Sequence, residues 1–348
     1  MNTEWGEIPP NTKNTARVVS CNREQYRIAK GTEVLQAVVK GRLRHEAKEA
    51  AELPVIGDWV EFEQSGDLAV ITGVLPRKSV ISRKIAGATT EEQPIASNID
   101  TVGIVMGLDG GRNFNVRALE RYLTLAWNSG AVPVVVLNKA DLAEDAEDYR
   151  GEAETAAPGV DILVTSALGG TGIEELRSLI GPGRTAVLIG PSGVGKSALT
   201  NALLGESAAR TNETRRGDKR GRHTTTNAAM YRIPGGGLLI DAPGLKELQL
   251  WGDTEGVDAV FEEIAEFASE CRFADCAHDG EPGCAVQDAL QNGNLSEERF
   301  LSYLDLRKEL EYLAYKTGER AKLQEHARNR KFGKMIKDMK KHHHKYNS

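Results

Sequence analysis

The chain has 348 residues, a length typical of two or three domains, and 40% of them are hydrophobic, enough to bury sizeable cores. No run approaches the roughly 18 consecutive apolar residues of a membrane span, which argues against an integral helical membrane protein. Four cysteines are too few and too clustered for a disulfide scaffold. The N-terminus lacks the basic-then-apolar order of a signal peptide, so we expect a cytoplasmic protein.

The N-terminal part predicts a small β-barrel. Residues 1–15 are polar, contain two prolines and are expected to be disordered. Residues 16–88 then contain short β segments with no helix-length period between them, which favours an OB-type barrel of the kind that often binds nucleic acid. The segments are Ala16–Ser20, Gln25–Ala29, Val34–Val39, Asp58–Phe62 and Ala69–Leu75. Trp59 and Phe62 lie on opposite faces of one strand, so at least one belongs to the core rather than to a base-stacking surface.

Residues 89–255 predict a parallel α/β sheet, because buried apolar runs alternate with amphipathic helical segments. One such run, 131–137, ends in Asn138-Lys139-Ala140-Asp141, at the end of the strand where ligands bind in such sheets. The Asp141 carboxylate can accept from the N1–H and the exocyclic amine of guanine, a pair of donors that adenine lacks. Asn138 can brace the loop, and the stem of Lys139 can lie over the base. Alone the tetrapeptide is a weak signal, because Asn, Lys and Asp are ordinary loop residues, but next to a phosphate loop it indicates guanine binding.

Ser166 and Ala167 follow the next predicted strand, 160–165. Small residues there allow backbone N–H groups to approach a base carbonyl. Ser166 is equally suited to cap a helix that begins near Thr171.

A phosphate loop follows at 190–197, which fits G-x-x-x-x-G-K-[ST] in full between an apolar strand and a helix start. The glycines let backbone N–H groups converge on an anion, and the helix adds the positive end of its dipole. Lys196 would reach the β- and γ-phosphates, and Ser197 would ligate Mg²⁺. The predicted phosphate-site residues are Gly190, Pro191, Ser192, Gly193, Val194, Gly195, Lys196, Ser197 and Ala198.

Two later segments are typical of γ-phosphate sensing. The stretch 210–226 contains six Lys/Arg and few apolar residues, and we expect it to be mobile until Thr225 binds Mg²⁺ and the γ-phosphate. The strand that starts near Gly237 ends in Asp-Ala-Pro-Gly, where Asp241 would hold a Mg²⁺-bound water and the Gly244 N–H would bond the γ-phosphate.

The base-reading motif precedes the phosphate loop, which is the reverse of the usual order in GTP-binding domains. This order, the barrel in front, the segment Gly221–Thr226 and the segment Leu119–Leu123 resemble the RsgA (YjeQ/EngC) family of circularly permuted GTPases. The resemblance implies a GTPase that assists late maturation of the small (30S) ribosomal subunit, binds its rRNA and is released on GTP hydrolysis. It also implies hydrolysis that is slow alone and stimulated by the small subunit.

The residue after Asp-Ala-Pro-Gly is Leu245, where Ras-like enzymes place a water-orienting glutamine. Leucine cannot orient water, in agreement with slow intrinsic turnover. We hypothesise that His223, near Thr225, positions the attacking water on the ribosome. The alternative is that His223 only packs or contacts rRNA.

The C-terminal part predicts a mainly helical zinc-binding domain at 256–315. Cys271, Cys276, His278 and Cys284 provide three thiolates and one imidazole, a closed tetrahedral set for one structural Zn²⁺. The family resemblance implies the same four ligands, and disulfide pairing or buried apolar cysteines are the alternatives. Cys21, alone in the barrel segment, is expected to be a buried thiol.

The tail at 316–348 carries eleven Lys/Arg against three Asp/Glu, which suggests an rRNA-binding arm, although a solvated terminus has the same composition. We expect a monomer with GTP, GDP and the small subunit as partners. Two other functions stay open at this point. One is a P-loop kinase or NTPase of other specificity, and the other is an RNA-binding module in which the nucleotide is only structural.

Overall fold

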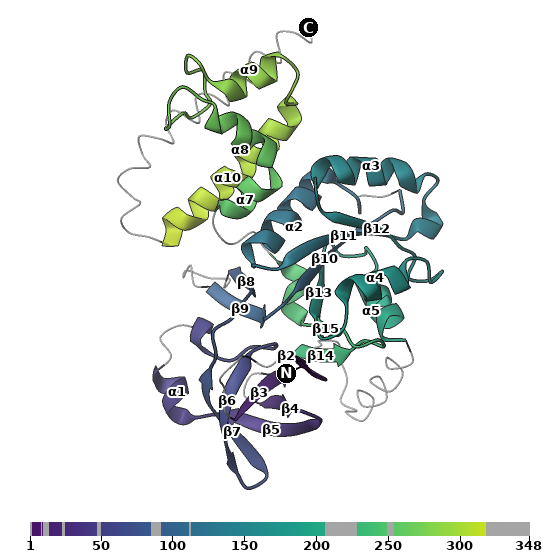
Figure 1. Ribbon diagram of the computed structural model, residues 1–348, viewed down its shortest axis with the longest axis vertical. Coiled ribbons are helices and arrows are strands. Elements are labelled where there is room, and N and C mark those ends of the chain that lie inside the picture. Colours follow the sequence, from purple (N-terminus) through teal and green to yellow (C-terminus); the bar gives the residue numbers. More distant parts are fainter. Residues whose placement is uncertain are drawn as a thin grey trace. The chain divides into compact units, whose positions relative to one another are not determined.

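The computed structural model describes residues 2–7, 9, 14–22, 25–46, 50–84, 92–110, 113–205, 228–248 and 254–317. The chain divides into two compact units, Met1–Trp251 and Gly252–Ser348. Their elements are labelled in Figure 1. Within the described ranges, no helix combines the length and the apolar character needed to cross a bilayer.

A closed five-stranded barrel begins the first unit and confirms the OB-type prediction. Its strands are β3 (Thr15–Cys21), β4 (Tyr26–Lys30), β5 (Glu33–Val39), β6 (Trp59–Ser65) and β7 (Leu68–Val74). The antiparallel run β3–β4–β5 continues through a parallel β5–β7 pair and an antiparallel β7–β6 pair, and β6 returns to β3. Side chains that alternate along these strands fill the barrel, among them Val18, Ile28, Val60 and Ile71.

The aromatic residues of the barrel are buried. Tyr26 and Phe62 belong to the barrel core, and Trp59 is buried outside it, with the Arg17 guanidinium 5.5 Å from its ring centre. Both Trp59 and Phe62 are therefore structural, and neither offers a free ring for stacking on a base. Cys21, at the end of β3, is only half-buried and packs against the barrel core, and burial raises the pKa of its thiol to about 11.

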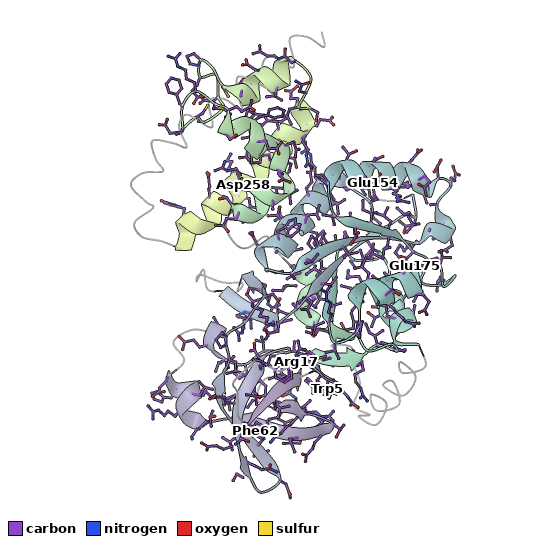
Figure 2. The ribbon with its side chains drawn as sticks, viewed as in Figure 1. Trp5, Arg17, Phe62, Glu154, Glu175 and Asp258 are labelled. Carbon is purple, nitrogen blue, oxygen red and sulfur yellow. The ribbon has the colours of Figure 1, made fainter. Side chains whose placement is uncertain are left out.

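Short elements flank the barrel: β1 (Asn2–Thr3), β2 (Gly6–Glu7), α1 (Gly41–Glu46), η1 (Ala50–Glu52), β8 (Val80–Lys84) and β9 (Glu92–Ser97). The β1–β2 hairpin forms where the sequence favours disorder. The Arg17 guanidinium donates to the Trp5 carbonyl oxygen at 2.7 Å, and both residues are labelled in Figure 2. Arg232 lies over the Trp5 ring and pairs with Glu4, so tertiary contacts order this segment.

A buried ion pair joins the barrel to the segment that follows it. Asp58 is fully buried and accepts from Nε and Nη2 of Arg77, both at 2.8 Å. The same carboxylate accepts from the Val55 N–H at 2.7 Å and from the Ser97 hydroxyl at 2.5 Å. With four donors, the charge of Asp58 is fully compensated, as buried charges require.

The rest of the first unit is a parallel sheet with helices on both faces, as predicted (Figure 1). The strands, in spatial order, are β12 (Asp161–Val164), β11 (Val132–Asn138), β10 (Thr101–Gly107), β13 (Thr185–Ile189), β15 (Leu238–Asp241) and the antiparallel β14 (Ala228–Arg232). The helices are α2 (Val116–Asn128), η2 (Ala140–Leu142), α3 (Ala146–Ala156), α4 (Ile173–Ile180), α5 (Lys196–Leu204) and η3 (Pro243–Glu247). Apolar residues of α4 and α5 cover one face of the sheet, and α2 packs against β10 and β11.

The strand order reverses between β10 and β13. From β10 the chain proceeds outward to β11 and β12, then returns to place β13 on the other side of β10. Ligands of open α/β sheets bind at such a reversal, beyond the carboxyl ends of the strands. On the other side, β14 pairs with both β15 and the barrel strand β3, so one sheet runs through both parts of the unit.

The second unit is helical, with α7 (Glu255–Val260), α8 (Glu262–Ser269), α9 (Ala285–Gln291) and α10 (Glu297–Thr317). Phe261 and Phe300 are fully buried, and Tyr303 packs edge-on against Phe261 with ring centres 5.6 Å apart. Arg299 lies 4.2 Å above the Phe261 ring and pairs with Glu263. These helices agree with the mainly helical character predicted for 256–315.

Candidate functional site

The phosphate loop connects β13 to α5 at the carboxyl edge of the sheet. Gly190 has φ +136° and Gly195 has φ +96°, values that residues with side chains rarely adopt. A Cβ atom at Gly190 would lie 2.2 Å from the Val105 carbonyl oxygen, and one at Gly195 would lie 2.3 Å from Nδ2 of Asn138. Both positions therefore require glycine for conformation and for space. Gly195 caps α5, whose positive end lies at the loop.

Lys196 and Ser197 open α5 beside this loop. The Lys196 ammonium group donates to the carbonyl oxygens of Gly190 and Pro191 at 2.7 and 2.6 Å, which holds its charge against the loop. Ser197 is exposed in the first turn of α5, a position from which its hydroxyl could ligate the predicted Mg²⁺. The remaining predicted residues of this segment are Ser192, Gly193, Val194 and Ala198, of which Val194 is buried in the core.

Asn138 joins the predicted base-reading loop to the phosphate loop. Its side chain is only 1% exposed, and its Nδ2 donates to the Val194 carbonyl oxygen at 2.9 Å. Its Oδ1 accepts from the Ala167 N–H at 3.1 Å and from the Thr165 hydroxyl at 3.3 Å. One buried amide therefore holds together three loops that are far apart in the sequence.

Asp141 is exposed at the same edge of the sheet and lies beside Ser166. The Ser166 hydroxyl donates to Oδ1 of Asp141 at 2.5 Å, which orients the carboxylate. The Ala140 N–H donates to the Thr165 carbonyl oxygen at 3.1 Å, so the two loops are also joined through their backbones.

Ser166 is not a helix cap. The helix α4 begins at Ile173, and Gly172 is its N-cap. The Ser166 hydroxyl instead accepts from the Gly169 N–H at 2.9 Å and closes the turn before the helix. Of the two interpretations of Ser166, the placement beside the base-reading loop is the one that agrees with this geometry.

Sequence reasoning missed two residues at this edge, Asp109 and Asn113. Lys139 has φ +67° and its ammonium group lies 2.5 Å from Oδ2 of Asp109. Asn113 Nδ2 donates to both oxygens of Asp109, at 3.0 and 2.8 Å. The hydrogen bond from Lys139 lowers the pKa of Asp109 from its ordinary value. A signal existed, because both residues follow the buried strand β10 in the chain.

Asp241 ends β15, which pairs in parallel with the strand that leads into the phosphate loop. Gly244 lies in η3, directly after it. Leu245 is only 4% exposed, so its side chain belongs to the core. His223 and Thr225 lie outside the described residues.

The second unit gathers a separate group of possible metal ligands. These are Cys271, Cys276, His278 and Cys284, and their ligand atoms all lie within 4.8 Å of one another. The Sγ atoms of Cys271 and Cys284 are 3.9 Å apart, and Nδ1 of His278 lies 3.6 and 3.4 Å from them. Burial lowers the pKa of His278, which favours the neutral imidazole that a metal requires.

Two further side chains support this cluster. The Glu281 carboxylate accepts from the N–H groups of Ala277 and Asp279, each at 2.9 Å, and one of its oxygens lies 3.7 Å from the Cys276 sulfur. Gln287 donates to the His278 carbonyl oxygen at 2.6 Å. These bonds fix the loop that carries two of the four possible ligands, as residues around metal sites commonly do.

The fold and the site together define a P-loop GTPase whose base-reading loop precedes its phosphate loop in the chain, with an OB-type barrel before it and a Cys₃His unit after it. Residues 74–251 match the family model described as RsgA GTPase. The chain belongs to the RsgA GTPase family.

The regions aligned with relatives span most of the chain. The small ribosomal subunit biogenesis GTPase RsgA 1 of Oceanobacillus iheyensis is 44% identical over 306 residues, 86% of each chain. The small ribosomal subunit biogenesis GTPase RsgA of Streptomyces coelicolor is 41% identical over 331 residues, 93% of this chain and 89% of the relative. The crystal structure of YjeQ from Thermotoga maritima matches with TM-score 0.64 and 28% identity, covering 85% of this chain and 98% of that structure. The circularly permuted GTPase YloQ shares the fold at TM-score 0.59, covering 87% of this chain and 97% of that structure.

Proposed function

We propose that this GTPase acts in the biogenesis of the small ribosomal subunit. We also propose that its affinity for the small subunit depends on whether GTP is bound or has been hydrolysed. Relatives that are 41–46% identical bear this function in their names. The observation that carries the nucleotide assignment is the hydrogen bond of 2.9 Å between Asn138 and Val194, which puts the base-reading and phosphate loops next to each other. A kinase or ATPase is not favoured, because Asp141 offers an acceptor suited to guanine and the family is one of GTPases.

Different residues would bind different parts of the nucleotide. The N–H groups of 190–195 and the positive end of α5 would hold the phosphates, and Lys196 would neutralise their charge. Asp141, held by Ser166, would accept from guanine, and the stem of Lys139 would lie along the ring. Small residues at Ala140 and Ala167 leave room for the base.

Magnesium fits this site by the chemistry of its donors. Ser197 is exposed at the start of α5, and Asp241 ends the adjacent strand, so a hydroxyl and a carboxylate lie near the phosphate loop. Mg²⁺ would supply charge compensation between the β- and γ-phosphates. Thr225 is proposed as a further ligand and the Gly244 N–H as a γ-phosphate donor.

The attacking water needs an orienting group other than Leu245, whose side chain is buried. We propose His223 for this role, in the ribosome-bound state. The competing proposal is that His223 only packs or contacts rRNA. If His223→Ala retained full stimulation by small subunits, the catalytic role of His223 would be wrong.

One structural zinc ion is proposed for the Cys₃His group. With Zn–S bonds of about 2.3 Å, tetrahedral geometry places two sulfur ligands about 3.8 Å apart. The Sγ atoms of Cys271 and Cys284 are 3.9 Å apart, so these residues fit a zinc ion. The four ligands would close the coordination shell, which suits a scaffold rather than a catalyst.

The barrel, the zinc unit and the basic tail are proposed to contact rRNA. The barrel aromatics are buried, so contact through the barrel would rely on charged and polar groups rather than on base stacking. Of the tail, residues 318–348 lie outside the described residues. We further propose a cytoplasmic, monomeric protein.

The decisive experiment measures GTP hydrolysis with and without purified small subunits. We expect slow turnover alone and marked acceleration by the subunits. Asp141→Asn should weaken GTP binding and favour xanthosine nucleotides, because an amide presents a donor where guanine also donates. Asp148→Asn, exposed on α3, is the matched control and should behave like the wild type. Unaccelerated turnover would favour a module in which the nucleotide is structural.

A further inference from the structure

The loop that follows β10 lies against both the base-reading loop and the phosphate loop of the proposed nucleotide site. The Leu108 N–H donates to the Asn138 carbonyl oxygen at 2.8 Å, and the Gly107 N–H donates to the Asn113 carbonyl oxygen at 3.1 Å. A Cβ atom at Gly107 would lie 3.4 Å from the Val194 Cα, so this loop packs directly against the phosphate loop. It is therefore fixed to both halves of the site.

Within this loop, Asp109 provides the counter-ion for Lys139. The two side chains are 20% and 24% exposed, so the pair, at 2.5 Å, is partly shielded from water. Asn113 donates to both carboxylate oxygens and thereby fixes the orientation of Asp109. A lysine side chain has several rotatable bonds, and holding its ammonium group removes most of that freedom before a ligand arrives.

We propose that Asp109, oriented by Asn113, is a positioning residue that fixes the Lys139 side chain in the conformation that receives the guanine base. This inference rests on the proposed nucleotide site and adds to it a residue outside the base-reading motif. A site with a fixed lysine binds the nucleotide without first ordering that side chain, so Asp109 contributes to affinity through preorganisation.

The role predicts a specific kinetic signature. The base is bound equally in GTP, in GDP and in the transition state of hydrolysis, so loss of Asp109 should weaken binding without changing the chemical step. Immobilising one long side chain corresponds to about a three- to tenfold change in affinity. We therefore expect Asp109→Ala to raise Kd for GDP and KM for GTP by this factor, with kcat within twofold of the wild type.

A double-mutant cycle tests whether Asp109 acts through Lys139. Dissociation constants for a fluorescent GDP analogue are measured for the wild type, Asp109→Ala, Lys139→Ala and the double variant. We expect Asp109→Ala to cost three- to tenfold in the wild type and less than twofold in the Lys139→Ala background. Equal losses in both backgrounds, or no loss in the wild type, would overturn the proposal.

Further variants separate this result from other causes. Asp109→Asn keeps the shape and an acceptor oxygen, so it should fold normally and show a smaller loss than Asp109→Ala. Asp161→Ala removes an exposed carboxylate at the amino end of β12 and should bind GDP like the wild type. If the wild-type protein bound neither GDP nor GTP, the proposed function itself would fail. If the wild type binds and neither Asp109 variant differs from it, only the positioning role is wrong.

Discussion

Replacing Asn138 by alanine removes a link between the two halves of the proposed nucleotide site. The amide donates to Val194 and accepts from Ala167 and Thr165, and it is almost completely buried. Alanine can make none of these bonds. The Val194 carbonyl oxygen and the Ala167 N–H would lose a partner at a place where water has little access, which is the costly way to lose a hydrogen bond.

Each buried polar group left without its partner costs about 1–3 kcal/mol. The Thr165 bond, at 3.3 Å, is long and contributes less. Two such losses give a destabilisation of about 3 kcal/mol for the first unit. For a unit of this size, that corresponds to a fall in Tm of about 6–12 °C. GDP affinity should fall as well, since Asn138 no longer holds the loops in register.

Thermal unfolding of the nucleotide-free protein measures the first effect, and titration with a fluorescent GDP analogue measures the second. Asn201→Ala, exposed on α5, is the matched control and should leave both quantities unchanged. If Asn138→Ala melted within about 1 °C of the wild type and bound GDP as tightly, Asn138 would not brace the site.

Two other predictions concern buried polar clusters. Cys284→Ser should lower the zinc content of the purified protein below one ion per chain and reduce the helical signal of the second unit, because a structural metal stabilises its own domain. Zinc retained at one ion per chain would show that Cys284 is not a ligand. Asp58→Ala should destabilise the first unit by about 3–5 kcal/mol in urea unfolding, because it leaves Arg77 with an uncompensated charge. Asp67→Ala, exposed at the β6–β7 turn, is its control, and equal midpoints for the two variants would contradict the role of Asp58.

Much of the architecture follows from local patterns. Short alternating segments predicted the barrel strands to within a few residues, and continuous apolar runs predicted the central sheet. The phosphate loop is readable from sequence because its chemistry requires glycine at fixed spacing, and Gly190 and Gly195 have positive φ as that requirement implies. The Cys₃His set can be recognised for a similar reason, since structural zinc sites are built from closely spaced thiolate and imidazole ligands.

Other features do not follow from local patterns. The strand β14 and the β8–β9 hairpin went unpredicted, because each is short and is stabilised by a partner rather than by its own periodicity. The hairpin of residues 2–7 forms because Arg17 and Arg232 contact Trp5, which composition alone does not reveal.

The sequence by itself determined which chemistry we propose at each position: a glycine loop for phosphate, a carboxylate at 141 for guanine and a thiolate cluster for metal. Only the tertiary structure decided which residues complete those sites. Asp109 meets Lys139, and Asn138 meets Val194, because the strand order reverses beside β10 and brings the ends of β10, β11 and β13 to one edge. Such contacts depend on how strands far apart in the chain pair, and local periodicity contains no information about that pairing.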